Sequence, residues 1–401
     1  MYCMKKQDQT TFDIVVIGGG PAGLAFAKAV SGQGLSIAIV EPAPRAALEK
    51  PSYDGREIAL THFSKKTMSE LGFFDHITAD QVSMIKKAHV VNGDSPYALK
   101  FDHREAGEET LGYMVSNQNI RRSSFAAVQG ADDITLLDER RVDDLTSDAS
   151  GARVTLDDGQ VLCARLVVGA DGRFSQSRRK MGIACDMLEW GRTCLVGVME
   201  HDGAHDDTAY ECFHYDRTLA VLPLNNGLVS VVITLPSEEA QEVLDMDPAA
   251  FAADIEARFE GRVGAMRLTQ TLHAYPLVCN YAKSFYAPRF ALLGDAAVGM
   301  HPVTAHGYNL GLRGAHTLAQ EVIKMARTGG DIGSSLPLRH YNRAHNIICK
   351  PIYLGTNTVV KLYTDQRKPA KIARKTLLHL GNVLKPARDM ITRQLTESHV
   401  A

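Results

Sequence analysis

The stretch that decides the fold reads DIVVIGGGPAGLAFAKAVSGQGLSIAIVE and occupies positions 13 to 41. Asp13–Ile17 is a short run rich in β-branched residues, which predicts a buried parallel strand. The alanine-rich segment Leu24–Val30 predicts a helix, and Ser36–Val40 predicts a second strand. We therefore expect a strand–helix–strand unit with a glycine-rich first turn.

The glycines of this turn have the spacing of a dinucleotide-binding loop. Gly18 permits a tight turn, Gly20 lets the backbone approach a pyrophosphate, and Gly23 lets the helix pack closely on the strand. The N–H groups at the start of the helix then face the phosphates. Glu41 lies 18 residues after Gly23 at the end of the second strand, where a carboxylate accepts both ribose hydroxyls and repels a 2′-phosphate. The alternative is a glycine-rich turn that binds nothing.

Two further apolar strands end in an aspartate beside a glycine. Arg165–Ala170 precedes Asp171 and its glycine, and Arg289–Leu293 precedes Gly294 and Asp295. Parallel strands of one sheet end at the same edge, so we expect these residues to approach the glycine-rich turn. The alternative for Asp171, and less so for Asp295, is a structural cap.

These motifs resemble those of the class A flavin monooxygenases, the aromatic-ring hydroxylases built like p-hydroxybenzoate hydroxylase. Asp171 is similar to the aspartate of the family's Asp-Gly motif. Gly294 and Asp295 look like the Gly-Asp motif, in which the aspartate binds the ribityl and pyrophosphate region of FAD. Arg56 resembles the arginine that reaches the flavin, and Gln118 falls where an arginine or glutamine touches the cofactor. For both, a surface polar residue is the alternative.

Beside the resemblance, the segment after Asp295 has a physical interpretation of its own. Gly307 opens an amphipathic helix that also contains Tyr308 and Asn309. Free N–H groups at a helix start can meet the pyrimidine end of an isoalloxazine and hold negative charge at N1 and O2 of the reduced flavin. We therefore add Gly307, Tyr308 and Asn309 to the predicted cofactor site.

Within that superfamily the sequence is most similar to the ubiquinone-biosynthesis ring hydroxylases of the 5-demethoxyubiquinol hydroxylase type. The similar elements begin at Arg56, Leu71, Tyr275 and Gly294. The resemblance implies FAD as cofactor, NAD(P)H as a transient electron donor, and O2. It also implies hydroxyl transfer from a C4a-hydroperoxide of the flavin to a polyprenylated phenol or quinol. An apolar face of the sheet predicted for residues 190–235 is expected to form the floor of the substrate pocket.

The chain departs from this family pattern at three places. It has His306 where the family commonly has glutamine and Gly314 where it commonly has aspartate, and the loop at residues 296–300 lacks the usual histidine. His306 is expected near the flavin ring, where its near-neutral pKa suits proton transfer to a substrate phenol. The alternative is that it only packs or hydrogen-bonds the loop backbone. These changes leave the hydroxylated ring carbon open.

We predict an α/β fold with a Rossmann-like FAD-binding domain, interrupted by an antiparallel-sheet substrate domain and followed by a helical C-terminal region. The FAD-binding domain is assigned to residues 1–75, 105–180 and 283–335. The substrate domain is assigned to residues 76–104 and 181–282, and the basic helical region to residues 336–401. Within the substrate domain, four strands are expected at Cys194–Glu200, Thr208–His214, Leu219–Pro223 and Leu228–Leu235.

Charge and cysteine content bound the function further. The 44 Lys and Arg residues nearly balance the 46 Asp and Glu residues, so we expect no nucleic-acid partner. From Lys361 to the end the chain is basic, with apolar residues at helical intervals, which favours docking on an anionic membrane surface or on other ubiquinone-biosynthesis proteins. A C-terminal helix packed on the core is the alternative. Seven cysteines without a C-x-x-C pair predict a cytoplasmic protein without a metal site. The basic tail and the polyprenylated substrate that the resemblance implies predict that this protein is peripheral on the inner membrane.

Three other functions remain open from the sequence. The first is a soluble aromatic or polyketide hydroxylase of the same fold. The second is a flavin-dependent polyprenyl reductase, which acts without oxygen uptake. The third is a flavin-binding scaffold that has lost its chemistry within a biosynthetic assembly, as the departures near Met300 and Gly314 suggest.

Overall fold

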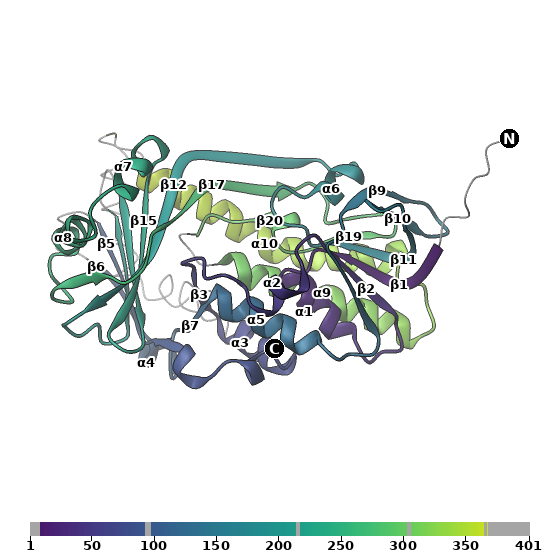
Figure 1. Cartoon of the computed structure of the whole chain (residues 1–401), viewed down its shortest axis with the longest axis horizontal. Helices are drawn as coiled ribbons and strands as arrows, with labels where there is room; N and C mark the ends of the chain where they lie inside the picture. Colours follow the sequence, from purple (N-terminus) through teal and green to yellow (C-terminus); the bar gives the residue numbers. More distant parts are fainter. Residues whose placement is uncertain (1–8, 93–97, 214–216, 303–305, 365–366, 368–401) are drawn as a thin grey trace.

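The computed structural model describes residues 9–92, 98–213, 217–302, 306–364 and 367. The molecule is elongated, with one sheet near each end and long helices between them (Figure 1). Strand segments alternate between the two sheets along the sequence, so the chain crosses from one end to the other several times.

The first sheet has eight strands and contains the predicted strand–helix–strand unit. Its main path runs in the order β18-β19-β11-β1-β2-β8, and β9 and β10 extend it beside β11. The strands β1, β2, β8, β11 and β19 pair in parallel. The bounds are β1 (Gln9–Ile17), β2 (Ile37–Glu41), β8 (Ile134–Asp138), β9 (Val142–Ser147), β10 (Ala152–Leu156), β11 (Val161–Gly169), β18 (Tyr286–Ala287) and β19 (Phe290–Leu292).

Two sequence-based boundaries were wrong, each for a local reason. The hairpin pattern at residues 153–163 predicts a strand over residues 160–163, separate from the strand at 165–170, but the two form the single strand β11, which pairs with β1 over its whole length. The helical spacing of residues 58–72 predicts one helix, but the segment starts as a strand (β3) that pairs with β7. The helix begins only after Thr61, because the Thr61 side chain accepts a hydrogen bond from the Ser64 amide at 3.2 Å and caps it.

The second sheet has nine strands, and one long strand leads into it. Its order is β20-β17-β12-β15-β14-β13-β5-β6, with β16 beside β12. In Figure 1, β12 runs from the region of the first sheet across the top of the molecule into the second sheet. The bounds are β5 (Lys87–Asn92), β6 (Ala98–Asp102), β12 (Cys185–His201), β13 (Thr208–Phe213), β14 (Thr218–Leu224), β15 (Leu228–Pro236), β16 (Met266–Leu268), β17 (His273–Ala282) and β20 (Val298–Gly299). All four strands expected in this region are present, and His214, the last residue expected in the second of them, lies outside the described residues.

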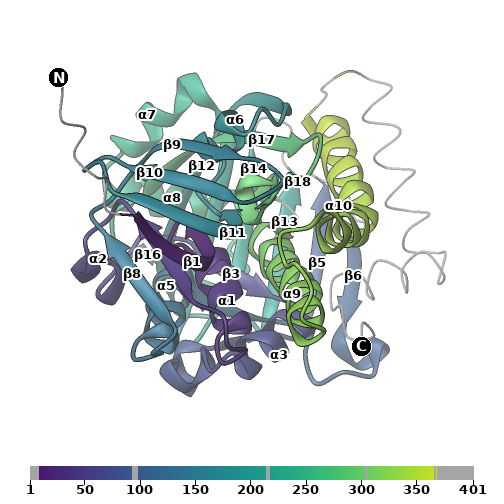
Figure 2. The ribbon, with the colours of Figure 1, turned by 90° about the vertical axis from the view of Figure 1, so that its right-hand side faces the viewer.

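Helices and a small sheet complete the fold. A three-stranded sheet has the order β3-β7-β4, with β3 (Glu57–Leu60), β4 (Ser83–Ile85) and β7 (Gly112–Ser116). Helices α9 and α10 run side by side, and α9 also packs against α1 (Figure 2). The helices are α1 (Pro21–Val30), α2 (Arg45–Glu49), α3 (His62–Glu70), α4 (His103–Ala106), α5 (Asn117–Val128), α6 (Gln176–Lys180), α7 (Ala240–Leu244), α8 (Pro248–Arg258), α9 (His306–Arg327) and α10 (Ser335–Thr364).

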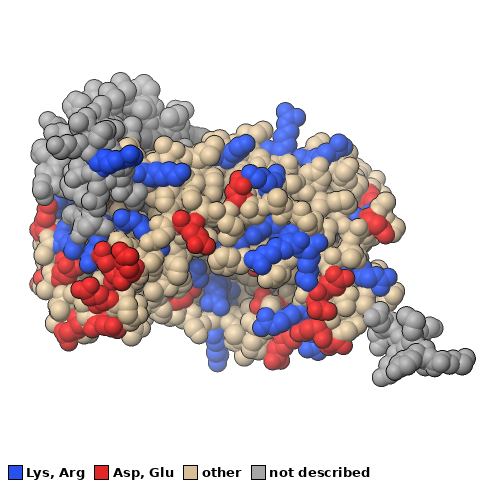
Figure 3. All heavy atoms as spheres, turned by 90° about the horizontal axis from the view of Figure 1, so that it is seen from above, with Lys and Arg blue, Asp and Glu red and all other residues tan. Residues whose placement is uncertain are grey.

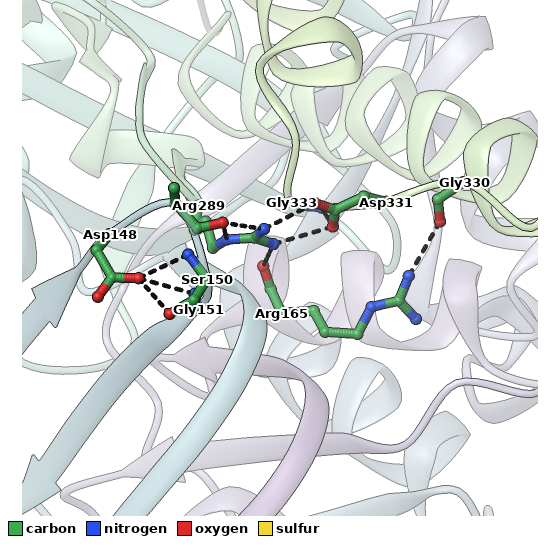
Figure 4. Close-up of polar contacts among 9 residues, drawn as sticks. Asp148, Ser150, Gly151, Arg165, Arg289, Gly330, Asp331 and Gly333 are labelled. Atoms are coloured by element: carbon green, nitrogen blue, oxygen red, sulfur yellow. Dashed lines mark hydrogen bonds and ion pairs between the residues drawn. The ribbon is translucent and has the colours of Figure 1, made fainter.

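An arginine clasp fixes the first sheet to the loop between α9 and α10 (Figure 4). Arg289 donates to the two carboxylate oxygens of Asp331 at 2.9 and 2.7 Å, and to the Arg165 carbonyl at 3.1 Å. Arg165 donates in turn to the Gly330 carbonyl and to the Asp13 carboxylate, both at 3.0 Å. Because charged, bidentate hydrogen bonds are directional, the clasp holds α9 in a defined position against the strands.

Surface charge and helix hydrophobicity are the features of the structure that relate to binding partners and membranes. Basic and acidic side chains intermingle on the face shown in Figure 3, in keeping with the near-balanced composition. Among the described residues, none of the helices is both long and apolar enough to cross a membrane. The most basic part of the predicted C-terminal region, residues 368–401, lies outside the described residues.

Candidate cofactor site

Three strand tips from distant parts of the chain meet at one edge of the first sheet. Ile17 of β1 is in register with Gly169 of β11, and Gly169 is in register with Leu292 of β19. The next residues continue the ladder, since the Ala170 amide donates to the Ile17 carbonyl at 2.7 Å and the Leu293 amide to the Gly169 carbonyl at 2.8 Å. The segments carrying the three predicted motifs therefore start at one level of the sheet, where open α/β sheets bind ligands.

The glycines of the first turn are required for different reasons. Gly18 has a φ of +108°, and a Cβ there would lie 2.5 Å from the Ala170 carbonyl oxygen. A Cβ on Gly23 would lie 2.2 Å from the Gly18 carbonyl oxygen, whereas a Cβ on Gly20 would meet nothing within 4 Å. Gly18 and Gly23 thus allow the backbone of the turn to pack closely on neighbouring backbone. The backbone of Gly20 is not covered by other residues, so a ligand can approach it.

The start of α1 suits an anionic group. The helix begins with Pro21 after Gly20, its first turn has no acidic residue, and no side chain caps it. Its first N–H groups and the positive end of its dipole are therefore available to a phosphate. Glu41 lies beside this turn at the end of β2 and accepts hydrogen bonds from the Gly19 amide at 2.6 Å and the Ala43 amide at 2.9 Å. Each carboxylate oxygen can accept a further bond, as a ribose requires.

The turn that follows β19 lies against the starts of both α1 and α9. Gly294 has a φ of +55°, and a Cβ there would lie 3.1 Å from the Ala22 side chain. A Cβ on Gly311 of α9 would lie 3.4 Å from the Gly294 Cα. Asp295 stands at this junction with its side chain partly exposed, and its carboxylate accepts a hydrogen bond from Arg173 at 2.9 Å. The starts of α1 and α9 and the Gly-Asp turn thus form one contiguous group.

Asp171 lies at the tip of β11, and its carboxylate is engaged in the following turn. It accepts hydrogen bonds from the hydroxyls of Ser175 at 2.6 Å and Ser177 at 2.8 Å, and from the Ser177 amide at 2.9 Å. These contacts hold the turn that leads into α6. The N-cap residue of α6 is Ser175, and contact of Asp171 with the cofactor stays a prediction.

Arg56 lies in a tight network that includes two residues the sequence did not single out. Asp54 accepts from Arg56 at 2.6 Å and from the Asn117 side chain at 2.7 Å. The guanidinium carbon lies 5.1 Å from the centre of the Tyr275 ring, and the Tyr275 hydroxyl donates to the Asp54 carbonyl at 2.7 Å. Burial lowers the pKa of Arg56, but the hydrogen bond and charge of Asp54, with a smaller contribution from Asp295, leave it raised.

Gln118 and Asn309 make structural contacts beside the site. The Gln118 side chain donates to the Pro51 carbonyl at 2.8 Å and so fixes the loop that carries Arg56. Asn309 donates to the Ala59 carbonyl at 2.8 Å and accepts from the Thr61 amide at 3.2 Å, which joins α9 to β3. Contact of either residue with the cofactor stays a prediction.

The first turn of α9 contains the other predicted residues. His306 is buried at the first position of the helix. A Cβ on Gly307 would meet nothing within 4 Å, so the backbone there is open to an approaching group. Burial raises the pKa of Tyr308 well above that of a free phenol. The proton-transfer role of His306 stays a prediction.

The departure at Gly314 has a packing explanation. A Cβ there would lie only 2.9 Å from His345 Nε2 on α10, so the His345 ring occupies the space of any larger side chain. His345 also stacks on Tyr341, with ring centres 5.6 Å apart. Burial, with the nearby charge of Arg313, lowers the pKa of His345 to about 3. The neutral His345 ring thus fills the space beside Gly314 and packs α10 against α9.

Comparison with known proteins agrees with this geometry. Residues 11–343 match the FAD binding domain family. The chain belongs to this family. It is 44% identical over 388 residues to the ubiquinone hydroxylase UbiM of Neisseria meningitidis, covering 96% of this chain and 84% of that protein. It is 33% identical to the ubiquinone hydroxylase UbiL of Rhodospirillum rubrum, covering 90% and 84%.

Solved structures show the same fold. The crystal structure of p-nitrophenol 4-monooxygenase from Pseudomonas putida superposes with a TM-score of 0.77 at 20% identity, covering 97% of this chain and 100% of that one. The α/β flavin monooxygenase fold predicted from the sequence is thus confirmed. The protein is an FAD-dependent monooxygenase that uses NAD(P)H as electron donor, and the bare turn at Gly20 and the uncapped start of α1 fit the pyrophosphate of FAD.

Proposed function

We propose that the protein hydroxylates the aromatic ring of a polyprenylated phenol or quinol in ubiquinone biosynthesis. The observation that carries this proposal is the 44% identity over 96% of the chain to a protein named ubiquinone hydroxylase. The convergence of three strand tips and two helix starts at one edge of the first sheet supports it. The ring carbon that receives the hydroxyl group is left open.

The residues of the chain have distinct tasks in this reaction. The start of α1 binds the pyrophosphate, Glu41 binds the ribose, and Asp295 with Arg56 lies at the flavin side of the site. The chemistry that FAD supplies when bound is electron transfer from NAD(P)H to O2 and delivery of an electrophilic hydroxyl group. The protein has to hold the ring close to that oxygen and to exclude water.

The second sheet supplies an apolar surface for the ring. Cys194, Val196 and Leu277 are buried together with Trp190 and Tyr275 packed against them. Tyr275 contacts Arg56, and the Trp190 ring lies 5.5 Å from that of His301, just before α9. This face of the sheet therefore adjoins the cofactor site.

Product analysis of the FAD-loaded enzyme tests the proposal. We expect oxygen uptake, NAD(P)H oxidation and incorporation of one atom of labelled O2 into a short-chain prenylated quinol. Equal turnover of prenylated and unprenylated phenols would indicate a soluble aromatic hydroxylase. Substrate reduction without oxygen uptake would indicate a reductase, and absence of quinol-stimulated NAD(P)H oxidation would indicate a scaffold. Each of these three results contradicts the proposal.

We also propose that the basic C-terminal region binds an anionic membrane surface, where a polyprenylated substrate resides. From residue 361 the chain has nine basic and three acidic residues, a net charge of +6. Each basic residue near an anionic surface contributes roughly 1 kcal/mol of attraction. Sedimentation with anionic vesicles should be lost when the chain is truncated after residue 367, beyond the end of α10. Equal sedimentation of both chains would refute this.

A further inference from the structure

A carboxyl group lies in a row on the second sheet whose other members are apolar except for a histidine at one end. Directly opposed residues on seven neighbouring strands form this row, and their side chains point to the same face. In spatial order they are His273, Val196, Val232, Ala220, Glu211, Val90 and Leu99. The opposite face is covered by helices, because Leu195, Val231 and Cys212 pack in one cluster with Phe251 and Ile255 of α8.

One end of the row lies against the loop that carries Arg56. A Cβ on Gly55 would lie 2.7 Å from His273 Cδ2 and 3.0 Å from Val196 Cγ2. Glu211 is three strands further along the sheet than Val196, roughly 14 Å at about 4.8 Å per strand. At the other end, Val90 and Leu99 pack in one cluster with residues of the three-stranded sheet. The segment from Val232 to Glu211 therefore lies between the loop that carries Arg56 and the part of the row that packs against the three-stranded sheet.

That segment is less covered than the opposite face of the same strands, and Val90 and His273 elsewhere in the row are likewise partly accessible. Val232, Ala220 and Glu211 all remain partly accessible, although the neighbouring residues on the helix-covered face, such as Val231 and Cys212, are at most 3% exposed. Val232 and Ala220 form an apolar surface beside the carboxyl group, and both side chains are partly accessible. An aromatic ring lying on this surface would reach Glu211 with a polar substituent.

Within the described part of the chain, the Glu211 side chain has no hydrogen bond or ion pair that would neutralise its carboxylate. Burial raises the pKa of Glu211 to about 8. The titratable groups whose charge is coupled to it are the thiols of Cys194 on β12 and Cys212 on its own strand. Burial raises the pKa of each thiol to about 12, so both are neutral, and the facing positions on β14 and β5 are apolar.

We infer that Glu211 is a catalytic residue that accepts the proton of a ring hydroxyl of the substrate. The inference rests on the proposed function, which supplies a phenol or quinol. The O–H bond of the ring hydroxyl breaks, its electron pair stays on the ring oxygen, and the proton bonds to a Glu211 oxygen. The more electron-rich ring then forms its C–O bond with the electrophilic hydroxyl group, as the O–O bond that joined this group to its donor breaks and the electron pair of that bond stays with the donor. The hydrogen of that ring carbon leaves as a proton to water, and Glu211 returns its proton to the ring oxygen.

The surroundings of Glu211 suit this transfer. A phenol has a pKa near 10, about six units above that of an ordinary carboxyl group, so an ordinary carboxylate is a poor acceptor. An apolar environment disfavours the charged carboxylate and brings its proton affinity closer to that of a phenolate. A ring activated in this way is a better nucleophile toward an electrophilic oxygen.

The pH profile of the Glu211→Gln enzyme tests the inference. In the wild-type holoenzyme, product formation should rise with pH through about 8 as Glu211 becomes the carboxylate. Glu211→Gln should lower product formation about 100-fold and abolish this rise, with unchanged FAD content and thermal stability. Glu242→Gln is the matched control, since Glu242 is exposed on α7, on the other side of the sheet. A Glu211→Gln enzyme with the wild-type rate and pH profile would overturn the inference.

Ligand binding gives a second readout that needs no turnover. Glu211→Val should fold, because valine suits a strand and this face is apolar. The wild type should bind an unreactive phenol at least tenfold more tightly than its methyl ether, and Glu211→Val should bind the two equally. Retention of the preference in Glu211→Val would refute the contact. A wild-type enzyme that hydroxylates no phenol or quinol would refute the proposed function instead, and the binding comparison would still report on Glu211.

Discussion

Gly18→Ala should separate the three strand tips and weaken FAD binding together with folding. The backbone of Gly18 has a φ of +108°, which costs a residue with a side chain about 2 kcal/mol. The added Cβ would lie 2.5 Å from the Ala170 carbonyl oxygen, and this crowding costs about 2 kcal/mol more. Relief requires Ala170 to move, although its amide bonds to Ile17 at 2.7 Å and joins β1 to β11. We expect the free energy of unfolding to fall by about 4 kcal/mol.

Gly20→Ala is the matched control for this experiment. Gly20 has a φ of −74°, and its Cβ would meet nothing within 4 Å, so the chain without cofactor should keep its stability within about 0.5 kcal/mol. The methyl group would nevertheless stand where backbone approaches the pyrophosphate, and FAD affinity should fall about tenfold or more. Urea unfolding and flavin-fluorescence titration measure the two quantities. Wild-type stability and FAD affinity in Gly18→Ala would refute the reasoning.

Three further predictions concern other parts of the structure. Asp54→Asn removes the charge that orients Arg56, so FAD affinity should fall about tenfold in fluorescence titrations. An unchanged FAD affinity in Asp54→Asn would contradict this prediction. Arg289→Ala removes the bonds to Asp331 and should lower the free energy of unfolding in urea by about 2 kcal/mol. Arg289→Gly should lower the free energy of unfolding by less than Arg289→Ala, since the φ of 54° at this position suits glycine. Equal losses in the two variants would show that this positive φ is not strained. Burial, opposed by the hydrogen bond from Tyr53, raises the pKa of Glu57 to about 7, so the folded state holds a proton there that the unfolded state releases above about pH 4.5. The free energy of unfolding should therefore fall by as much as roughly 3 kcal/mol between pH 5 and 7.5. Glu57→Gln should remove this loss in urea titrations at the two pH values. The same pH dependence of stability in Glu57→Gln and the wild type would disprove the role of Glu57.

The sequence predicted those parts of the site that follow from local spacing. The glycines at 18, 20 and 23 follow directly on a β-branched strand. Backbone geometry and close packing explain Gly18 and Gly23, whereas a Cβ on Gly20 would meet nothing in the chain itself. The strand tips at Asp171 and Asp295 were also predictable, because parallel strands end at a common edge. What the aspartates contact was not predictable. The partners of Asp171 are serines in a turn whose course depends on tertiary structure.

Other features depend on residues far apart in the sequence. The Asp54 side chain contacts Asn117, which belongs to a different element, although the acid lies only two positions before Arg56 and offered a local signal. Glu211 was missed because a lone acid in a strand usually faces solvent. Its apolar neighbours come from β5, β12, β14 and β15, and only the strand register brings them together.

The FAD content of the purified protein tests the central claim most directly. The account predicts a yellow protein with a flavin absorption spectrum that releases one FAD per chain on denaturation. Gly20→Val should release less than a tenth of that amount while it remains folded. A colourless wild-type protein that cannot be reconstituted with FAD, or equal FAD content in both proteins, would contradict the assignment of the cofactor to the three strand tips.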